Sequence, residues 1–372
     1  MRVVLAVFRY VPALGGATRH VQLLAEGMAA AGHSVTVVTQ SEPNTPWEEA
    51  IRGVRVLRLG MRKVAGYRVP RGYRRALRAL DADVFQLNGN RIWCVDFYLP
   101  FARSFEWPQA IMPMGFYHYW MRRGFARWLY YQRYLPGRLQ AFDGYVALTP
   151  GEKGQVVGWG YPAERARVIP VGIDLAEFAS PSPLRDAERA SWSLNTPHVA
   201  VYVGGLYDNK RVDRLVRAVA ATRGEWGLVV AGRDVPSHPY DLSHCSALAR
   251  QLGAPVRFLG DVPRERILAA LGAADAYLQG SQFEGFGIGL LEAMAAGRPF
   301  VAFDAGAARE LASSGAGVVV GSEAEMATVL ASMTPRLEEM GRAALSTVRA
   351  YSAAHMVDRT LDLYRSIAKA AP

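Results

Sequence analysis

The chain has 372 residues, of which 51% are hydrophobic and 20% are charged. This composition is typical of a packed globular protein and excludes intrinsic disorder, and the lack of any run of about 18 apolar residues predicts no membrane-spanning helix. The net charge is +10, and the excess lies in one half, because residues 1–170 hold 23 Lys and Arg against 11 Asp and Glu. This asymmetry indicates an anionic partner, either a nucleic acid or a membrane.

The chain begins with a short apolar run at residues 2–8, which Arg9 interrupts. We expect a buried first strand there, because a signal peptide needs a longer apolar region and a small-residue cleavage site. The two cysteines, Cys94 and Cys245, have neither zinc-site nor disulfide spacing, which indicates a reducing compartment.

Short β-branched runs alternate with helical stretches in both halves of the chain. The first half is predicted to hold a helix at 20–31 and strands at 2–8, 34–39, 54–59, 83–87, 110–114, 144–148 and 166–170. The second half is predicted to hold strands at 199–203, 227–231, 255–259, 275–279, 299–303 and 316–320, with helices at 211–222, 243–252, 263–273, 288–297 and 306–313. Residues 179–198, rich in Pro and Ser, predict an inter-domain segment, and an amphipathic helix is expected at about 355–369. The alternation predicts two doubly wound α/β domains with parallel sheets.

A loop with paired glycines, Gly15 and Gly16, follows the first predicted strand and opens the helix that contains His20. Glycines there let a ligand approach the backbone, and a helix N-terminus favours an anion. An ordinary tight turn is the alternative, since the loop lacks the G-x-G-x-x-G spacing of a dinucleotide site.

A second loop joins the predicted strand at 275–279 to the helix at 288–297. Its alternating glycines, Gly285, Gly287 and Gly289, expose backbone N–H groups at a helix N-terminus, which suits a diphosphate or sugar hydroxyls. Glu284 precedes these glycines and Glu292 follows them. Because phosphate repels carboxylates, we expect both to accept hydrogen bonds from sugar or ribose hydroxyls, with a solvated helix cap as the alternative for Glu284.

A third loop follows the predicted strand at 199–203 and contains Gly204, Gly205, Lys210 and Arg211. Lys210 at a helix start is placed to pair with phosphate oxygens. A solvated surface lysine is the alternative.

In this order along nearly the whole chain, these motifs resemble the retaining GT-B glycosyltransferases of family 4. The resemblance includes residues 142–149, residues 168–178, where Val171 replaces the family's usual Asn, and above all the E-x7-E element Glu284…Glu292. It implies a GT-B fold, in which two Rossmann-like domains face a cleft. Residues 1–178 would be an acceptor-binding domain, completed by a crossover helix at 354–372, and residues 179–353 would bind a nucleotide-diphosphate sugar, a UDP- or GDP-sugar.

The resemblance also implies roles for single residues. Glu292 would hold the ribose, Glu284 the donor sugar, and Lys210 with the Gly16 amide would neutralise the departing diphosphate, without a metal or other cofactor. The implied catalytic residues are Glu284, Lys210, His118 and His20, and the implied donor-binding residues are Gly15, Gly16, Gly205, Lys210, Arg211, Leu259, Gly285, Phe286, Gly287, Ile288, Gly289 and Glu292. The base would lie near Phe258 to Asp261.

The chain departs from the family pattern at three places. The arginine that often follows the glycine at Gly205 is missing, and Arg211 is a candidate substitute. Gln86 and Asn88 occupy positions of an often-present His-x-His, and Met114 replaces another histidine. His118 and His20 therefore remain as candidates for contacting the reacting sugar. The pair Asp81 and Asp83 is interpreted as a helix-to-strand turn and not as a metal motif.

Basic and aromatic residues gather in two segments, Arg52–Arg78 and Phe116–Arg138. Aromatic rings interleaved with arginines suit an anionic membrane surface, and a surface helix with a buried aromatic face is the alternative. We expect no nucleic acid partner. The expected protein is a cytoplasmic enzyme, peripheral on the inner face of the cytoplasmic membrane, that transfers a hexose with retention to a lipid-linked or envelope glycan. The alternatives are a soluble small-molecule acceptor, and a GT-B-like epimerase or nucleotide-sugar-binding module.

Overall fold

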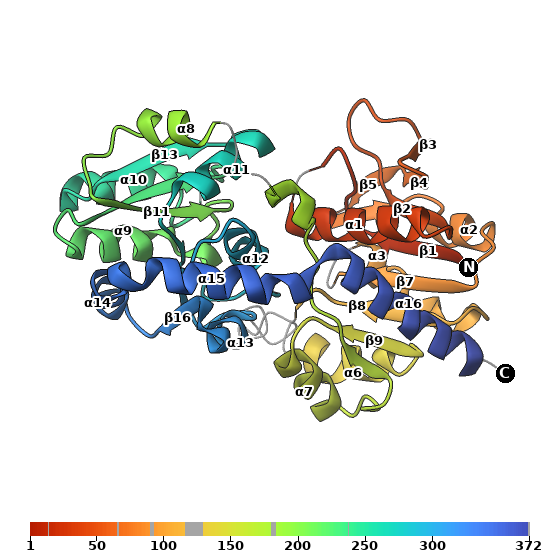
Figure 1. Ribbon diagram of the computed structural model, residues 1–372. Helices are drawn as coiled ribbons and strands as arrows, with labels where there is room; N and C mark the ends of the chain where they lie inside the picture. The colour runs from red at the N-terminus through yellow and green to blue at the C-terminus, as the bar shows by residue number, and fades with distance from the viewer. Residues whose placement is uncertain are drawn as a thin grey trace. The chain divides into compact units, whose positions relative to one another are not determined.

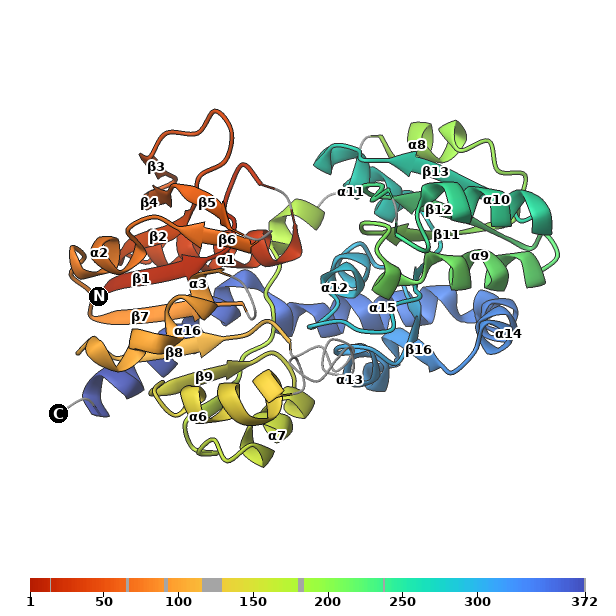
Figure 2. The same ribbon diagram turned by 180° about the vertical axis from the view of Figure 1, so that it is seen from behind.

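The computed structural model describes residues 1–13, 15–64, 67–89, 93–115, 129–179, 184–236 and 238–370. The chain forms two compact units, one made of Met1–Gly172 with Ala353–Pro372 and the other of Ile173–Ser352 (Figure 1). Each unit has its own sheet with helices packed on it, and both views of the chain show these two sheets (Figures 1 and 2). The predicted α/β class with two doubly wound sheets is confirmed.

The first unit contains an eight-stranded sheet that is parallel except at one edge. Its order is β10 (Ala166–Val168), β9 (Gly144–Ala147), β8 (Gln109–Met112), β7 (Val84–Asn88), β1 (Arg2–Val7), β2 (Ser34–Gln40), β4 (Val54–Leu59) and β3 (Glu48–Ile51). Only β3 runs antiparallel to its neighbour, β4. The sheet confirms the first predicted strand as buried, and it adds β3, whose charged residues gave no strand signal.

Two helices from opposite ends of the sequence pack together in the first unit: α1 (Gly16–Ala30) and α16 (Ala353–Ala370). Gly27 allows this approach, because a Cβ there would lie 2.7 Å from Val357 Cγ2. Helix α1 begins four residues before the predicted start, directly after Gly15. The other helical segments among the described residues of this unit are α2 (Tyr73–Arg78), α3 (Trp93–Asp96), a 3-10 helix (Leu99–Ser104), a π-helix (Tyr130–Tyr134), α6 (Leu135–Leu139) and α7 (Pro150–Gly158).

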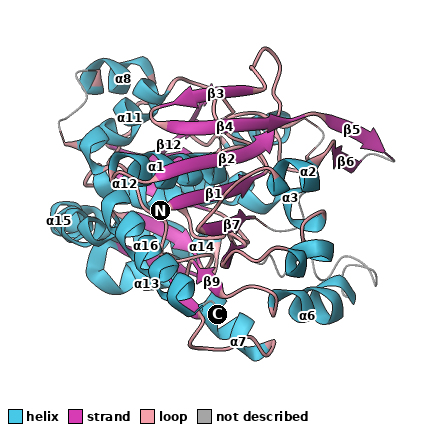
Figure 3. Cartoon of the chain, turned by 90° about the vertical axis from the view of Figure 1, so that its right-hand side faces the viewer, coloured by secondary structure: helices cyan, strands magenta, loops and turns pink. Residues whose placement is uncertain are grey.

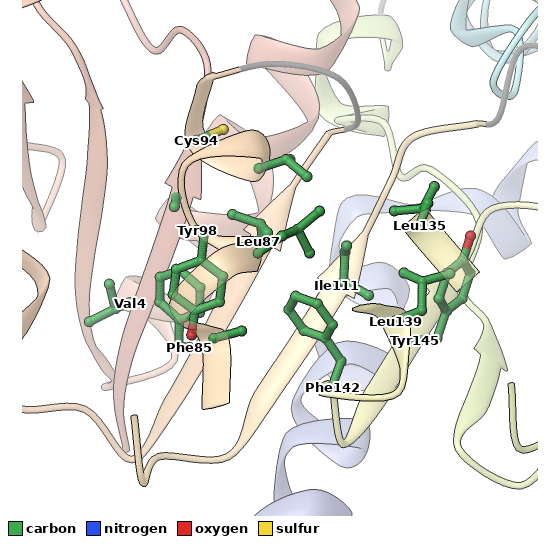
Figure 4. Packing of buried hydrophobic residues seen from close by; sticks show 14 of the residues in the cluster. Val4, Phe85, Leu87, Cys94, Tyr98, Ile111, Leu135, Leu139, Phe142 and Tyr145 are labelled. Carbon is green, nitrogen blue, oxygen red and sulfur yellow. The ribbon is translucent and has the colours of Figure 1, made fainter. Parts of the chain in front are cut away.

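Aromatic side chains fill much of the core of the first unit. Phe85 from β7 stacks on Tyr98, with ring centroids 4.6 Å apart, and Phe142 lies 6.2 Å from the same Tyr98 ring (Figure 4). These rings bury large apolar areas, so they tie the segment after α3 to the sheet.

The second unit contains a six-stranded sheet that is parallel throughout. Its order is β13 (Val256–Gly260), β12 (Trp226–Ala231), β11 (His198–Val203), β14 (Ala276–Gln279), β15 (Phe300–Phe303) and β16 (Gly317–Val320). Numbered within the unit this order is 3-2-1-4-5-6, the order of a dinucleotide-binding Rossmann sheet. The chain reverses its direction of winding between β11 and β14.

Among the described residues, five helices of the second unit connect successive strands, as predicted, and two more follow β16. They are α9 (Val212–Ala221), α10 (Leu242–Leu252), α11 (Arg264–Ala273), α12 (Ile288–Ala295), α13 (Ala308–Leu311), α14 (Glu323–Met333) and α15 (Leu337–Val348), with short helical turns at Leu175–Phe178, Asp208–Lys210, Ala312–Ala316, Thr334–Arg336 and Arg349–Tyr351. Helix α9 packs with both α10 and α14, whereas α12 packs with α15.

The segment at 179–198 is more structured than its composition predicts. It contains α8 (Arg185–Ser191), which packs on α11, and the Trp192 side chain that follows is 1% exposed. Trp192 Nε1 donates to Glu188, and Arg266 also pairs with Glu188 at 2.9 Å. The described part of the segment thus belongs to the second unit, whose first residue is Ile173.

A two-stranded antiparallel ribbon, β5 (Met61–Val64) and β6 (Tyr67–Pro70), lies apart from the large sheet of the first unit. Figure 3 shows this ribbon projecting beyond β4. Its sequence is strongly basic and gave no strand signal. Among the described residues, no helix has the length and apolar character needed to cross a membrane.

Candidate functional site

The loops after β11 and β14 lie at the point where the second sheet reverses its winding. The two strands are parallel neighbours, so their carboxyl ends and the loops that follow share one edge of the sheet. Ligands of doubly wound sheets bind at this edge. Asn209 links the two loops, since its Nδ2 donates to Phe283 O at 3.2 Å and its O accepts from Gln282 N at 2.8 Å.

The predicted cation and the first predicted carboxylate meet across these loops. Lys210 Nζ, after β11, donates to Glu284 Oε1, after β14, at 2.6 Å. Ser281 donates to the same oxygen at 2.7 Å. The Lys210 side chain is 24% exposed and that of Glu284 is 13% exposed, so solvent screens the pair only partly. Sequence spacing identified Lys210 and Glu284 but not Ser281, which lies three residues before Glu284.

The second carboxylate of the E-x7-E element lies on α12 and also has a cationic partner. Arg264, the first residue of α11, donates from Nη1 to Glu292 Oε1 at 2.6 Å. The same guanidinium donates to Glu177 Oε2 at 2.6 Å from Nη2. Arg264 was not predicted as a site residue, although it lies three residues after the expected base-binding segment, Phe258 to Asp261.

The backbone of the second loop requires glycine at two positions. Gly287 caps α12 with φ of 103°, in the left-handed region that glycine adopts most easily. Gly280 lies against the first loop, where a Cβ would come 2.4 Å from Arg211 O. The loop therefore ends at the α12 N-terminus, where Ile288 and Gly289 begin the helix after Gly285 and Phe286.

Arg211, the candidate second phosphate cation, has a bidentate partner on its own helix. Its Nε and Nη2 each donate to Asp213 at 2.8 Å, and its guanidinium carbon lies 4.5 Å from the centre of the Tyr240 ring. Asp213 raises the pKa of this guanidinium. These contacts direct the Arg211 charge to Asp213 and favour a structural role over the expected contact with phosphate.

Three other predicted donor-binding positions lie along the same edge. Gly205 follows β11, and Leu259 lies within β13 next to Gly260, whose O accepts from Gly232 N at 2.8 Å. Asp261, at the end of the expected base-binding segment, pairs with Arg233 at 3.2 Å. The carboxyl ends of β11, β13 and β14 thus bring the predicted residues of the second half to one edge of one sheet.

In the first unit, the glycine loop lies at the corresponding reversal, between β1 and β7. Gly15 is the N-cap of α1 with φ of 146°, and Gly16 is the first helical residue. His20 lies in the same helix but is 3% exposed, and among the described residues its ring nitrogens have no hydrogen-bond partner. Burial lowers its pKa to about 4, so the ring is neutral. This burial disfavours the expected contact of His20 with a sugar. His118 lies outside the described residues.

The positions where the family often has His-x-His form a buried network. Gln86 Nε2 donates to Asn88 Oδ1 at 2.7 Å, and Gln86 Oε1 accepts from the Tyr364 hydroxyl of α16 at 2.8 Å. Met114, at the third such position, has φ of 62°, an uncommon value for a non-glycine residue. The amides at 86 and 88 thus join the sheet to the last helix.

The acidic pair Asp81 and Asp83 and the single carboxylate of Glu152 have structural partners in the first unit. Arg2 donates to both Asp81 and Asp83, as expected for a turn before β7. Glu152 on α7 accepts from Tyr145 Oη at 3.0 Å and from Leu148 N at 2.8 Å. Burial raises the pKa of Glu152 to about 7. Among the described residues, no three His, Cys, Asp or Glu side chains gather as a metal site.

Two families of sequences match most of the chain between them. The family described as "Glycosyl transferase 4-like domain" matches residues 15–172, and "Glycosyl transferases group 1" matches residues 185–338. The lipopolysaccharide 1,6-galactosyltransferase of Salmonella typhimurium is 31% identical over 168 residues, 44% of this chain and 43% of that protein. The lipopolysaccharide core biosynthesis mannosyltransferase LpcC of Rhizobium leguminosarum bv. viciae is 35% identical over 43% of this chain and 47% of its own length. The match thus spans less than half of these two curated relatives.

A longer match, at lower identity, is with the GDP-mannose:cellobiosyl-diphosphopolyprenol alpha-mannosyltransferase of Xanthomonas oryzae pv. oryzae. It is 25% identical over 98% of this chain and 96% of that protein. Among solved structures, sucrose-phosphate synthase of Thermosynechococcus elongatus has a TM-score of 0.82 at 21% identity, covering 99% of both chains. Anabaena Alr3699/HepE, in complex with UDP-glucose, has a TM-score of 0.81 at 17% identity, covering 98% of this chain and 100% of its own. These structural matches show a shared fold.

Proposed function

Because the chain belongs to the glycosyl transferase group 1 family, with a glycosyl transferase 4-like first half, we propose that it is a retaining hexosyltransferase. In this proposal it takes the sugar from a UDP- or GDP-sugar and transfers it to a membrane-associated acceptor, a lipid-linked or envelope glycan. The observation that carries the proposal is the pair of carboxylates at the carboxyl edge of the second sheet. Glu284 and Glu292 are each paired with a cation 2.6 Å away, and both lie on the loop and helix that follow β14.

The geometry supports a division of work among these groups. A carboxylate that is ionised and held in place is a good acceptor for hydroxyls, so Glu284 would bind the donor sugar and Glu292 the ribose. Lys210 would share its charge between Glu284 and the diphosphate. The amides of Phe286, Gly287 and Ile288 come at the N-terminus of α12, where the helix dipole favours an anion.

The chemical step follows from where charge develops. The C1–O bond to the diphosphate breaks, and its electron pair stays on the phosphate oxygen. The acceptor hydroxyl oxygen bonds to C1 on the face that the diphosphate leaves, and the hydroxyl proton passes to the departing phosphate oxygen. Lys210 and the helix amides would stabilise the growing negative charge, which is the largest contribution that a site of this kind can make. This proposal requires no metal ion or other cofactor.

The relatives support a glycan acceptor. Two curated relatives act in lipopolysaccharide synthesis by name, and the one that matches over almost the full length is named for a cellobiosyl-diphosphopolyprenol acceptor. The UDP-glucose in the structure of Alr3699/HepE supports a nucleotide-sugar donor.

The basic first half supports a membrane-associated acceptor. Of the ten basic residues at 52–78, three pair with carboxylates: Arg52 with Glu26, Arg55 with Glu48, and Arg58 with Glu49. The other seven form no salt bridge with any residue that the structure describes, and they are Arg62, Lys63, Arg68, Arg71, Arg74, Arg75 and Arg78. Arg62, Lys63 and Arg68 lie on the β5–β6 ribbon, Arg71 follows it, and the other three lie on α2.

Exposed apolar and aromatic side chains accompany these cations, of which Arg74 lies 5.5 Å from the centre of the Phe101 ring. Val64 is 46% exposed, Tyr67 42% and Trp47 66%. Exposed rings beside cations suit a layer of anionic headgroups, where each cation contributes about 1 kcal/mol. Of the second predicted segment, Phe116–Arg138, residues 116–128 lie outside the described residues, and Tyr134 is 37% exposed. We propose that this basic surface holds the protein on the inner face of the cytoplasmic membrane.

A transfer assay tests the proposed function. Radiolabelled UDP- and GDP-hexoses are incubated with the protein and a membrane lipid extract, and the label is followed into the organic phase. We expect a labelled glycolipid with wild-type protein and none with the Lys210→Ala variant. A labelled product in the aqueous phase would indicate a soluble acceptor, and an isomerised donor without a new glycoside would indicate an epimerase. Either result overturns the proposal.

A further inference from the structure

Arg264 connects the ribose-binding candidate Glu292 to a second carboxylate, Glu177, for which the sequence predicted no role. Its Nη1 donates to Glu292 Oε1 at 2.6 Å, while its Nη2 and Nε donate to Glu177 Oε2 at 2.6 and 3.1 Å. Glu177 lies in the helical turn Leu175–Phe178, more than one hundred residues before Glu292. Arg264 thus has two separate carboxylate partners, each close enough for a charge-assisted hydrogen bond.

The surroundings restrict the guanidinium to this arrangement. The side chains of Arg264, Glu177 and Glu292 are 34%, 24% and 12% exposed. The Phe178 ring centre lies 5.7 Å from the guanidinium carbon and covers one side of it. Burial alone would lower the pKa of Arg264, but the charges of Glu292 and Glu177 outweigh burial and raise it. Arg264 therefore stays charged beside Glu292.

We propose that Arg264 is a positioning residue for the nucleotide ribose. It holds Glu292 in the orientation from which the carboxylate accepts hydrogen bonds from two ribose hydroxyls, and Glu177 anchors Arg264 in this position. This inference rests on the proposed function, since it takes the ligand to be a nucleoside diphosphate or its sugar. It adds a specificity: the site distinguishes a ribose from a deoxyribose through Arg264, which itself contacts no part of the nucleotide.

The chain offers a matched control two residues along the same helix. Arg266 also pairs with a buried glutamate, Glu188, at 2.9 Å, and its side chain is 39% exposed, close to the 34% of Arg264. Glu188 is hydrogen-bonded to Trp192 and lies on α8, not on the loops after β11 or β14. Removing Arg266 therefore breaks a similar ion pair without touching Glu292.

Calorimetric titration with chemically matched nucleotides tests the proposal. UDP, GDP and ADP are titrated into the full chain to find the one that binds, and its 2′,3′-dideoxy counterpart is then titrated. The proteins are wild type and the variants Arg264→Ala, Arg264→Lys, Glu177→Gln and Arg266→Ala. Because a misplaced charged acceptor loses most of its hydrogen-bond contribution, we expect Arg264→Ala to weaken the ribonucleotide about tenfold and the dideoxynucleotide less than about twofold. Arg264→Lys and Glu177→Gln should give smaller losses in the same direction, and Arg266→Ala should match wild type.

Steady-state kinetics give a second test, the change in donor KM compared with the change in kcat. A purely structural role of Arg264 would not change KM selectively. Arg264→Ala should raise the donor KM about tenfold and change kcat less than about threefold, because ribose contacts serve ground and transition states alike. Thermal unfolding checks that each variant is folded. If Arg264→Ala does not fold, Arg264→Lys and Glu177→Gln still test the proposal.

Two outcomes overturn the inference. If Arg264→Ala weakens the binding of the ribonucleotide and of the dideoxynucleotide equally, Arg264 acts on the base or the phosphates. If the variant binds both as tightly as wild type, Arg264 has no role in nucleotide binding. If the wild-type protein binds none of the three nucleotides, it is the proposed function that fails, so the two failures are distinguishable.

Discussion

Replacing Lys210 with alanine tests the part of the site on which the chemistry depends most. Two charges 2.6 Å apart attract each other by about 6 kcal/mol at an effective dielectric constant of about 20. Loss of hydration offsets most of this attraction, and Ser281 still donates to Glu284 in the variant. We therefore expect Lys210→Ala to lower the free energy of unfolding by only about 1–3 kcal/mol.

The effect on turnover should be larger than the effect on stability. Negative charge grows on the diphosphate as the sugar leaves, and a cation fixed beside it is worth most at that moment. Removing one such group costs about 2–4 kcal/mol of barrier, or roughly 30- to 1,000-fold in kcat, with a smaller change in donor KM.

Initial rates of nucleoside diphosphate release, measured with saturating acceptor over a range of donor concentrations, separate the two parameters. Lys369→Ala, at an exposed position of α16, is the control for loss of a lysine. A kcat for Lys210→Ala within about threefold of wild type would refute the assignment of Lys210 to the leaving diphosphate.

Three further predictions concern other groups. Glu292→Ala should raise the donor KM about tenfold with little change in kcat, whereas Glu284→Ala should mainly lower kcat, because contacts to the reacting sugar tighten in the transition state; equal effects on both parameters in both variants would contradict this division. The pKa of Glu152 is raised from 4.5 to about 7, so the folded state holds its proton more tightly than the unfolded state, and stability is lost as the pH rises through this interval. The free energy of unfolding is measured with urea at about pH 5 and about pH 8. Between these two pH values, that of wild type should fall by up to about 3 kcal/mol relative to that of Glu152→Gln. A difference between the two proteins that does not change with pH would contradict the burial argument. Binding to anionic vesicles, measured by sedimentation, should weaken as salt rises towards about 0.5 M, and its salt-sensitive part should disappear when four arginines are replaced by glutamate: Arg71, Arg74, Arg75 and Arg78. Wild-type protein that stays in the supernatant at low salt would contradict the membrane proposal.

The sequence predicted the sheets because their strands are buried on both faces. Runs such as those of β1 and β12 are almost entirely apolar. Strands β3, β5 and β6 were not predicted, because they are rich in charged residues. Strand β3 lies at the edge of the large sheet, and β5 and β6 form a separate ribbon. Helix α8 escaped because Pro and Ser dominate its surroundings, and the burial of Trp192 is a tertiary effect.

The parts of the candidate site that lie directly after strands were predictable from the sequence. Lys210, Glu284 and Glu292 each follow a predicted strand, and carboxyl ends of neighbouring parallel strands meet at one edge. Side-chain pairing is not encoded in such spacing. Arg211 pairs with Asp213, while Arg264, which has no motif, reaches Glu292. The burial of His20 likewise depends on the packing of α1 and not on the glycines that precede it.

The central claim, that the edge of the second sheet at β11 and β14 binds a nucleotide-diphosphate sugar, is tested most directly by amide hydrogen exchange. Exchange is measured with and without the nucleoside diphosphate that calorimetry identifies, at about 100 times its dissociation constant, where binding adds about 2.7 kcal/mol to the stability of the bound form. The account predicts slower exchange in the loop at 204–211 and in the loop and helix start at 281–292. Protection confined to other segments, or no protection at saturation, would contradict it.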